Sequence, residues 1–232
     1  MIPLHDDNPT DGTPVVTVAL IVSCVLVFLY QSSLPGEPGE RFVFEFGAIP
    51  AVVFGTAQIP AVVIPPYATL VTSMFLHGGW MHLIGNMLYL WIFGNNIEDV
   101  MGHGRFIVFY LTCGILAALS HALTDPSSTV PMVGASGAIS GVLGAYVLLF
   151  PRAHVLVFIP GIGTTRVAAG VVLGMWFATQ LLSGGMSAGS PGGGVAFFAH
   201  IGGFVAGMML IGLFKRADVP FFAPARLRRW DV

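Results

Sequence analysis

Six stretches of this sequence are apolar over lengths that cover most or all of a lipid bilayer. A membrane-crossing helix needs about 17–25 such residues. Only 9% of the 232 residues are charged, whereas a soluble domain has roughly one quarter charged residues. The sequence therefore predicts an all-α membrane protein, a six-transmembrane-helix bundle. The expected spans are residues 15–30, 80–97, 106–123, 134–150, 167–182 and 195–214.

The segment between the first two spans, residues 31–79, is also apolar in part. Because proline removes a backbone donor and kinks a helix, the four prolines at positions 50, 60, 65 and 66 leave no run long enough to cross the bilayer. We expect a long, membrane-associated first loop. The whole chain then divides into a short N-terminal tail (1–14), a six-span domain (15–214) and a basic C-terminal tail (215–232).

Basic residues gather on one side of this topology. Six spans place both termini on the same side, and Arg41 is the one basic residue expected on the other. Because cytoplasmic loops carry the excess of Lys and Arg, both termini are expected in the cytoplasm, in a multi-pass protein of a prokaryotic cell membrane. A net charge of −2 argues against a nucleic-acid partner. The basic residues of the expected cytoplasmic side are Arg105, Arg152, Arg166, Lys215, Arg216, Arg226, Arg228 and Arg229.

Four polar side chains are expected at one depth near the outer face. His82 and Asn86 are four residues apart, so they share one face of the second span. Ser136 begins the fourth span, and His200 lies near the start of the sixth. Ionisable residues inside a bilayer are rare and suggest function. The alternative for Ser136 is a packing serine whose hydroxyl bonds the backbone of its own helix. The alternative for His82 and Asn86 is a structural hydrogen bond between helices.

Small residues recur at helical spacing in the fourth and sixth spans. This spacing lets two helix backbones approach closely, and it also serves ordinary helix packing. Close approach would bring Ser136 and His200 to hydrogen-bond distance. The residues are Gly137, Gly141 and Gly144 in the fourth span, and Ala199, Gly203 and Gly207 in the sixth.

These residue types favour acyl transfer by a Ser–His dyad. No carboxylate is expected at the level of Ser136, and no His-Glu-x-x-His motif points to a metal, so neither a metal nor a cofactor is expected. His200 would take the Ser136 proton. His82, Asn86 and the free backbone N–H of Ser136 would stabilise the oxyanion.

Three motifs in this order resemble the signatures of the rhomboid intramembrane serine proteases. They are Gly134-Ala135-Ser136-Gly137, His82-x-x-x-Asn86 and Ala199-His200-x-x-Gly203-x-x-x-Gly207. The resemblance implies that Ser136 is the nucleophile and His200 the base, with His82 and Asn86 at the oxyanion site. It also implies that the substrates are transmembrane helices of other proteins, cleaved near the outer face.

Two positions depart from the family pattern. The first loop lacks a Trp-Arg pair, and Ser140 stands where some members have an aromatic residue beside the histidine. The sequence therefore names no residue that orients His200. A catalytically silent rhomboid-like protein that binds transmembrane helices is the alternative function; a transporter is disfavoured because no inverted repeat is visible. The glycine-rich loop 183–194 and the fifth span are expected to be mobile, and the oligomeric state is left open.

Overall fold

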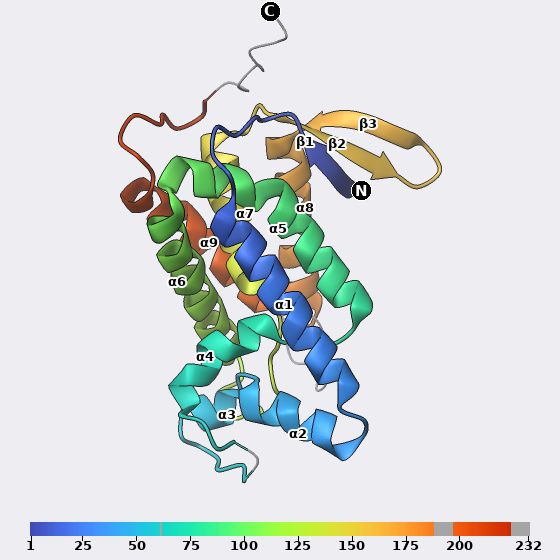
Figure 1. Cartoon of the computed structure of the whole chain (residues 1–232), viewed down its shortest axis with the longest axis vertical. Coiled ribbons are helices and arrows are strands. Elements are labelled where there is room, and N and C mark those ends of the chain that lie inside the picture. Colours follow the sequence, from blue (N-terminus) through green and yellow to red (C-terminus); the bar gives the residue numbers. More distant parts are fainter. Residues whose placement is uncertain (61, 188–196, 224–232) are drawn as a thin grey trace, which may run out of the picture.

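The computed structural model describes residues 1–60, 62–187 and 197–223, and it is mostly helical. A bundle of long helices carries a small sheet at one end and short helices at the other (Figure 1). Each of the six apolar stretches overlaps one long helix, and several of these helices extend beyond the stretch. These helices are α1 (Val15–Ser33), α5 (Trp80–Met101), α6 (His103–Ala122), α7 (Ser136–Leu149), α8 (Ala169–Ser187) and α9 (Phe197–Phe214).

Four helices of the described part, namely α1, α6, α8 and α9, are long and apolar enough to cross a membrane. The other two long helices do not meet this description. α5 has 22 residues with acidic and amide groups in its last turns, and α7 has only 14 residues. At about 1.5 Å per residue, α7 is roughly 21 Å long, shorter than the ~30 Å hydrocarbon core.

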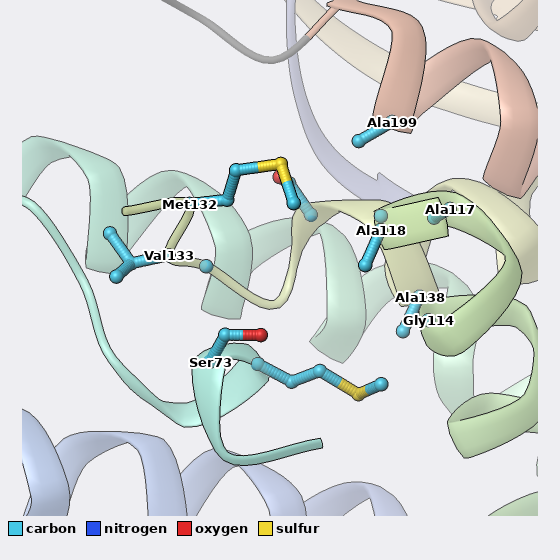
Figure 2. Close-up of a pocket in the computed structure, with 12 residues that line it drawn as sticks. Ser73, Gly114, Ala117, Ala118, Met132, Val133, Ala138 and Ala199 are labelled. Atoms are coloured by element: carbon cyan, nitrogen blue, oxygen red, sulfur yellow. The ribbon is translucent and has the colours of Figure 1, made fainter. Parts of the chain in front are cut away.

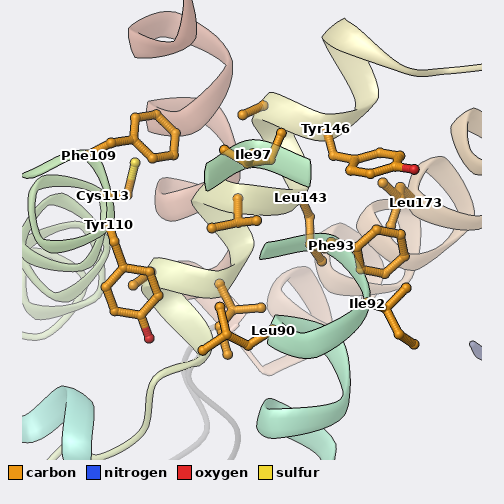
Figure 3. Packing of buried hydrophobic residues seen from close by; sticks show 14 of the residues in the cluster. Leu90, Ile92, Phe93, Ile97, Phe109, Tyr110, Cys113, Leu143, Tyr146 and Leu173 are labelled. Atoms are coloured by element: carbon orange, nitrogen blue, oxygen red, sulfur yellow. The ribbon is translucent and has the colours of Figure 1, made fainter. Parts of the chain in front are cut away.

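α7 can be this short because protein surrounds it. It packs against α5, α6, α8 and α9, and eleven of its residues are buried. Tyr146 meets Phe93 of α5 edge-to-face, with ring centroids 5.0 Å apart. Figure 3 shows Tyr146 and Leu143 in the same apolar cluster as Ile97 and Cys113 from the neighbouring helices. α7 is therefore the central element of the bundle.

The first loop contains short helices and turns in its described residues, as the prolines predict. Pro50 and Pro66 each lie in the first turn of a helix, where the missing N–H costs nothing. These elements gather at the end of the bundle where α7 begins (Figure 1). Their bounds are α2 Glu37–Phe46, α3 Pro50–Val53, η1 Pro66–Ala68, α4 Thr69–Thr72 and η2 Ser73–Phe75.

A three-stranded antiparallel sheet lies at the other end, so the expectation of an all-α fold is wrong here. Its order is β1 (Ile2–Asp6), β2 (His154–Ile159) and β3 (Gly163–Ala168). Val155 and Val157 of β2 face inward and are fully buried, the period-2 pattern of a half-covered strand. β1 forms because β2 supplies its partner from about 150 residues away, so local sequence gives little sign of it.

The N-terminal segment is fixed to the bundle by polar contacts. The buried carboxylate of Asp6 accepts a hydrogen bond of 2.6 Å from the Tyr146 hydroxyl. The buried carboxylate of Glu98 accepts bonds of 2.8 Å and 2.7 Å from the backbone N–H groups of Val16 and Thr17. Glu98 thus satisfies free donors at the start of α1, where the helix dipole also favours a negative charge.

Candidate active site

Ser136 is the first residue of α7, directly after a turn that requires glycine. Gly134 has φ +126°, which L side chains rarely adopt, and its N–H donates to the Ser73 carbonyl at 2.9 Å. A side chain at Gly134 would also meet the His82 ring, because an added Cβ would lie 2.7 Å from its Cε1 atom. The turn brings the start of α7 against the imidazole of α5.

The His200 ring of α9 reaches Ser136. Its Nε2 lies 2.8 Å from the Ser136 Oγ, within the distance expected for a nucleophile and its base. Close helix packing supports this pair: Cβ atoms added at Gly203 and Gly207 of α9 would overlap the carbonyl oxygens of Gly137 and Gly141. Gly137 and Gly141 themselves pack mainly on Ala117 and Cys113 of α6. The small residues therefore join three helices, not two.

A second group holds the other nitrogen of the His200 ring. The Nδ1 atom lies 2.8 Å from the Oε1 atom of Gln180 in α8, and the Trp176 ring lies 5.8 Å from the imidazole, centroid to centroid. Ser140 turns away from the histidine, because its hydroxyl donates to the Ser136 carbonyl at 2.6 Å. The side chains that contact the His200 ring therefore come from α8, and not from the Ser140 position of α7.

His82 and Asn86 face the same turn from α5. The backbone N–H of Gly78 donates to Nδ1 of His82 at 3.2 Å, so Nε2 carries the proton and lies toward Gly134. The Nδ2 group of Asn86 is buried and has no hydrogen-bond partner among the described residues. A buried amide donor costs free energy until an acceptor arrives, so this N–H group is available for an oxyanion.

A further histidine, His77, lies beside His82. The ring of His77 is fully buried, and its centroid lies 5.2 Å from that of the His82 ring. Burial, reinforced by His82, lowers the pKa of His77 to about 4. His77 is therefore neutral at physiological pH and adds no charge beside Asn86.

A small cavity opens beside the serine. Its volume is about 40 Å³, and its wall is made mostly of alanine and glycine residues, with two methionines. Figure 2 shows Ala117, Ala118 and Ala138 on one side of it, with Ser73, Met132 and Val133 around the rest. Ser136 itself belongs to this wall. The cavity can accept a small apolar group next to the nucleophile.

The part of the chain covered by the structure contains no cluster of three His, Cys, Asp or Glu residues that could hold a metal ion. Residues 183–187 of the predicted glycine-rich loop are helical, in α8. Residues 188–194 of that loop and the arginines of the C-terminal tail beyond position 223 lie outside the described residues. Gln180, Trp176 and His77 are the site residues that the sequence did not reveal. For Gln180 the available sign was an amide in an otherwise apolar span.

Comparison with known proteins identifies the family of this chain. The model of the Rhomboid domain matches residues 66–217. The rhomboid protease GluP of Bacillus subtilis is 30% identical over 200 residues, which are 85% of this chain and 34% of that protein. Rhomboid protein 1, mitochondrial, of Saccharomyces cerevisiae is 29% identical over 192 residues (73% of this chain, 52% of that protein).

Rhomboid-like protease 3 of Toxoplasma gondii is 27% identical over 205 residues, which are 88% of this chain and 68% of that protein. The chain thus spans about one third of the first relative and about half of the second. The matched region includes His82, Asn86, Ser136 and His200. The chain is a multi-pass membrane protein that belongs to the rhomboid family.

Proposed function

We propose that the chain is an intramembrane serine endopeptidase in which Ser136 is the nucleophile and His200 is the base. The observation that carries this proposal is the 2.8 Å approach of His200 Nε2 to Ser136 Oγ. The orphan amide of Asn86 and the Nε2–H of His82 beside the same turn support it. They provide donors in advance for the negative charge of a tetrahedral intermediate.

The reaction follows from these positions. Ser136 Oγ attacks a substrate carbonyl carbon while its proton passes to Nε2 of His200. The carbonyl oxygen becomes negative and accepts hydrogen bonds from Asn86, His82 and the Ser136 backbone N–H. The C–N bond then breaks, the amine leaves with the proton from His200, and water hydrolyses the acyl-enzyme by the reverse proton route.

We infer that α5 and α7 complete a six-helix bundle across the membrane. α7 begins in the site and ends near the sheet, and its neighbours replace lipid around it. β1 and residues 216–222 both contact the end of the bundle opposite Ser136: Arg216 N–H donates to the Val100 carbonyl and Phe222 N–H to the Leu148 carbonyl. Both termini then share the basic, cytoplasmic side, and Ser136 lies near the outer face.

The proposed substrates are transmembrane helices of other membrane proteins, cut near that face. The small cavity beside Ser136 suits a small side chain next to the scissile bond. A prokaryotic cell membrane remains a prediction, since a mitochondrial protein is among the relatives. The second candidate function is a silent rhomboid that binds helices without cleaving them, and the intact Ser136–His200 pair favours the protease.

The test uses the full chain in liposomes with a model transmembrane substrate and a labelled fluorophosphonate. The wild type should cleave the substrate and become labelled, while Ser136→Ala should do neither. Ser23→Ala is the matched control, because the Ser23 hydroxyl bonds only its own helix, at the Ala19 carbonyl. Cleavage by Ser136→Ala at the wild-type rate would refute Ser136 as the nucleophile, and helix binding by a wild type that neither cleaves nor becomes labelled would favour the silent alternative.

A further inference from the structure

Gln180 is a buried polar residue of α8, a helix whose sequence is otherwise mostly apolar. Its side chain is 8% exposed, and it points inward to the imidazole of His200, with Oε1 2.8 Å from Nδ1. Burying an amide is costly unless its hydrogen bonds are made. The burial of Gln180 therefore indicates a polar role in addition to packing.

The hydrogen bonds of the amide fix which end faces the histidine. The Nε2 group of Gln180 donates to the Trp176 carbonyl at 3.3 Å and to the Thr179 hydroxyl at 3.2 Å. In the reversed orientation, Oε1 would instead face the Trp176 carbonyl oxygen, and two acceptors would oppose each other. The backbone of α8 thus directs Oε1 toward His200.

An acceptor at Nδ1 decides the tautomer of the ring. With Oε1 opposite, Nδ1 of His200 must carry the proton, which leaves the Nε2 lone pair for the Ser136 hydroxyl at 2.8 Å. That is the form required of a general base. The Trp176 ring, tilted by 37° to the imidazole, packs beside the ring from the same turn of α8.

We propose that Gln180 is the positioning residue of the Ser136–His200 pair, so that the site is a Ser–His–Gln relay spread over α7, α9 and α8. This inference rests on the proposed protease function. Gln180 acts through His200 and does not contact the reacting carbonyl. A neutral amide performs the orienting part of a third triad member without burying a carboxylate, which would be costly inside a membrane.

The relay also makes the base depend on the position of α8. Ser136 and His200 belong to α7 and α9, which are locked together through Gly203 and Gly207, whereas the orienting acceptor comes from a third helix. A displacement of α8 would remove the acceptor and leave the serine and histidine in contact. Loss of Gln180 should therefore lower turnover without exposing or separating the other two residues.

The experiment compares Gln180→Met, which has similar length and no acceptor oxygen, with Gln180→Glu, which keeps the oxygen. Full-length protein in liposomes is assayed for kcat and KM on the model substrate across pH. Gln180→Met should lose about 10²-fold in kcat with KM within about twofold, since the substrate contacts remain. Gln180→Glu should recover part of kcat, because one of its oxygens still faces Nδ1 while the other lacks the N–H that Gln180 donates to the Trp176 carbonyl. The acid limb of its pH–rate profile should move to higher pH.

Leu181→Ala is the control, because position 181 is 48% exposed and lies on the same helix. It measures how truncation of a side chain of α8 by itself affects turnover, and it should retain the wild-type kcat. The proposal is overturned if Gln180→Met keeps the wild-type kcat at every pH. It is also overturned if Gln180→Met and Gln180→Glu are equally slow and their pH–rate profiles match that of the wild type. Failure of the proposed function is distinct from both results, because the wild type would then neither cleave the substrate nor react with the fluorophosphonate, or Ser136→Ala would cleave as fast as the wild type.

Discussion

The α-carbon of Gly207 lies directly against the carbonyl oxygen of Gly141, which brings the backbones of α9 and α7 into contact. A Cβ built at Gly207 would overlap that oxygen, and the atoms it meets are all backbone, which cannot rotate away. The contact lies two helical turns from His200. The separation of the two helices, and with it the reach of His200 to Ser136, depends on the absence of this methyl group.

Gly207→Ala should therefore force α9 away from α7. Overpacking of this kind costs about 1–3 kcal/mol, and the displacement should lower the cleavage rate more than 10-fold by lengthening the proton-transfer distance. Thermal unfolding in detergent and the rate of fluorophosphonate labelling would measure the two effects.

Gly212→Ala is the control on the same helix, because its new Cβ would lie 3.7 Å from the Phe221 ring, an ordinary contact. It should unfold at the wild-type temperature or slightly above, since alanine is the better helix former. If Gly207→Ala were as stable and as active as Gly212→Ala, the close approach of α9 to α7 at Gly207 would not be needed for stability or for cleavage.

Asn86→Ala should slow cleavage while leaving the protein folded. The variant removes an N–H donor that has no partner in the described resting structure, so no native hydrogen bond is lost. Removal of one oxyanion donor costs about 10²–10³ in kcat. Steady-state kinetics on the model substrate would show the loss in kcat with KM little changed.

Ile84→Ala, at a 53% exposed site on the same helix, controls for the general effect of truncation in α5. Its kcat should equal that of the wild type. A wild-type kcat for Asn86→Ala would exclude the amide from the oxyanion site, and an equal fall in both variants would assign the effect to helix packing.

Asp6→Asn should stabilise the protein at neutral pH. Burial raises the pKa of Asp6 from 3.8 to about 6, against the smaller opposing effect of the Tyr146 hydrogen bond. The folded state therefore holds the proton more tightly than the unfolded state. The stability that this proton provides is fully present below about pH 4 and is lost as the pH rises through 6, a change of up to about 3 kcal/mol.

His77 changes the stability in the opposite direction. Because its pKa is about 4 in the folded state, the free energy of unfolding decreases as the pH drops from 6.5 toward 4. The difference between wild type and Asp6→Asn, measured by unfolding temperature from pH 4 to pH 8, isolates Asp6. The gain from Asp6→Asn should grow as the pH rises. A gain that stays constant across this pH range would contradict the assignment.

Much of the site could be predicted from the sequence because it lies on regular helices. Helical spacing puts His82 and Asn86 on one face of α5, and the alternation of spans puts the starts of α5, α7 and α9 at one level. The glycines of α7 and α9 indicate close packing between helices. These relations are local or follow from topology, so they need no knowledge of how far one helix is rotated against another.

The rotation of α8 and the strand pairing of the N-terminal segment depend on long-range packing. Whether Gln180 faces lipid or His200 depends on the packing of α8 against α9, and a single amide among apolar residues does not reveal it. β1 likewise exists because β2 offers an edge to it far along the chain, and Asp6 is buried because Tyr146 lies beneath it. Hydrophobicity and spacing act locally, so the sequence alone predicts the long helices and the polar residues that they carry, whereas long-range packing decides which of those side chains meet.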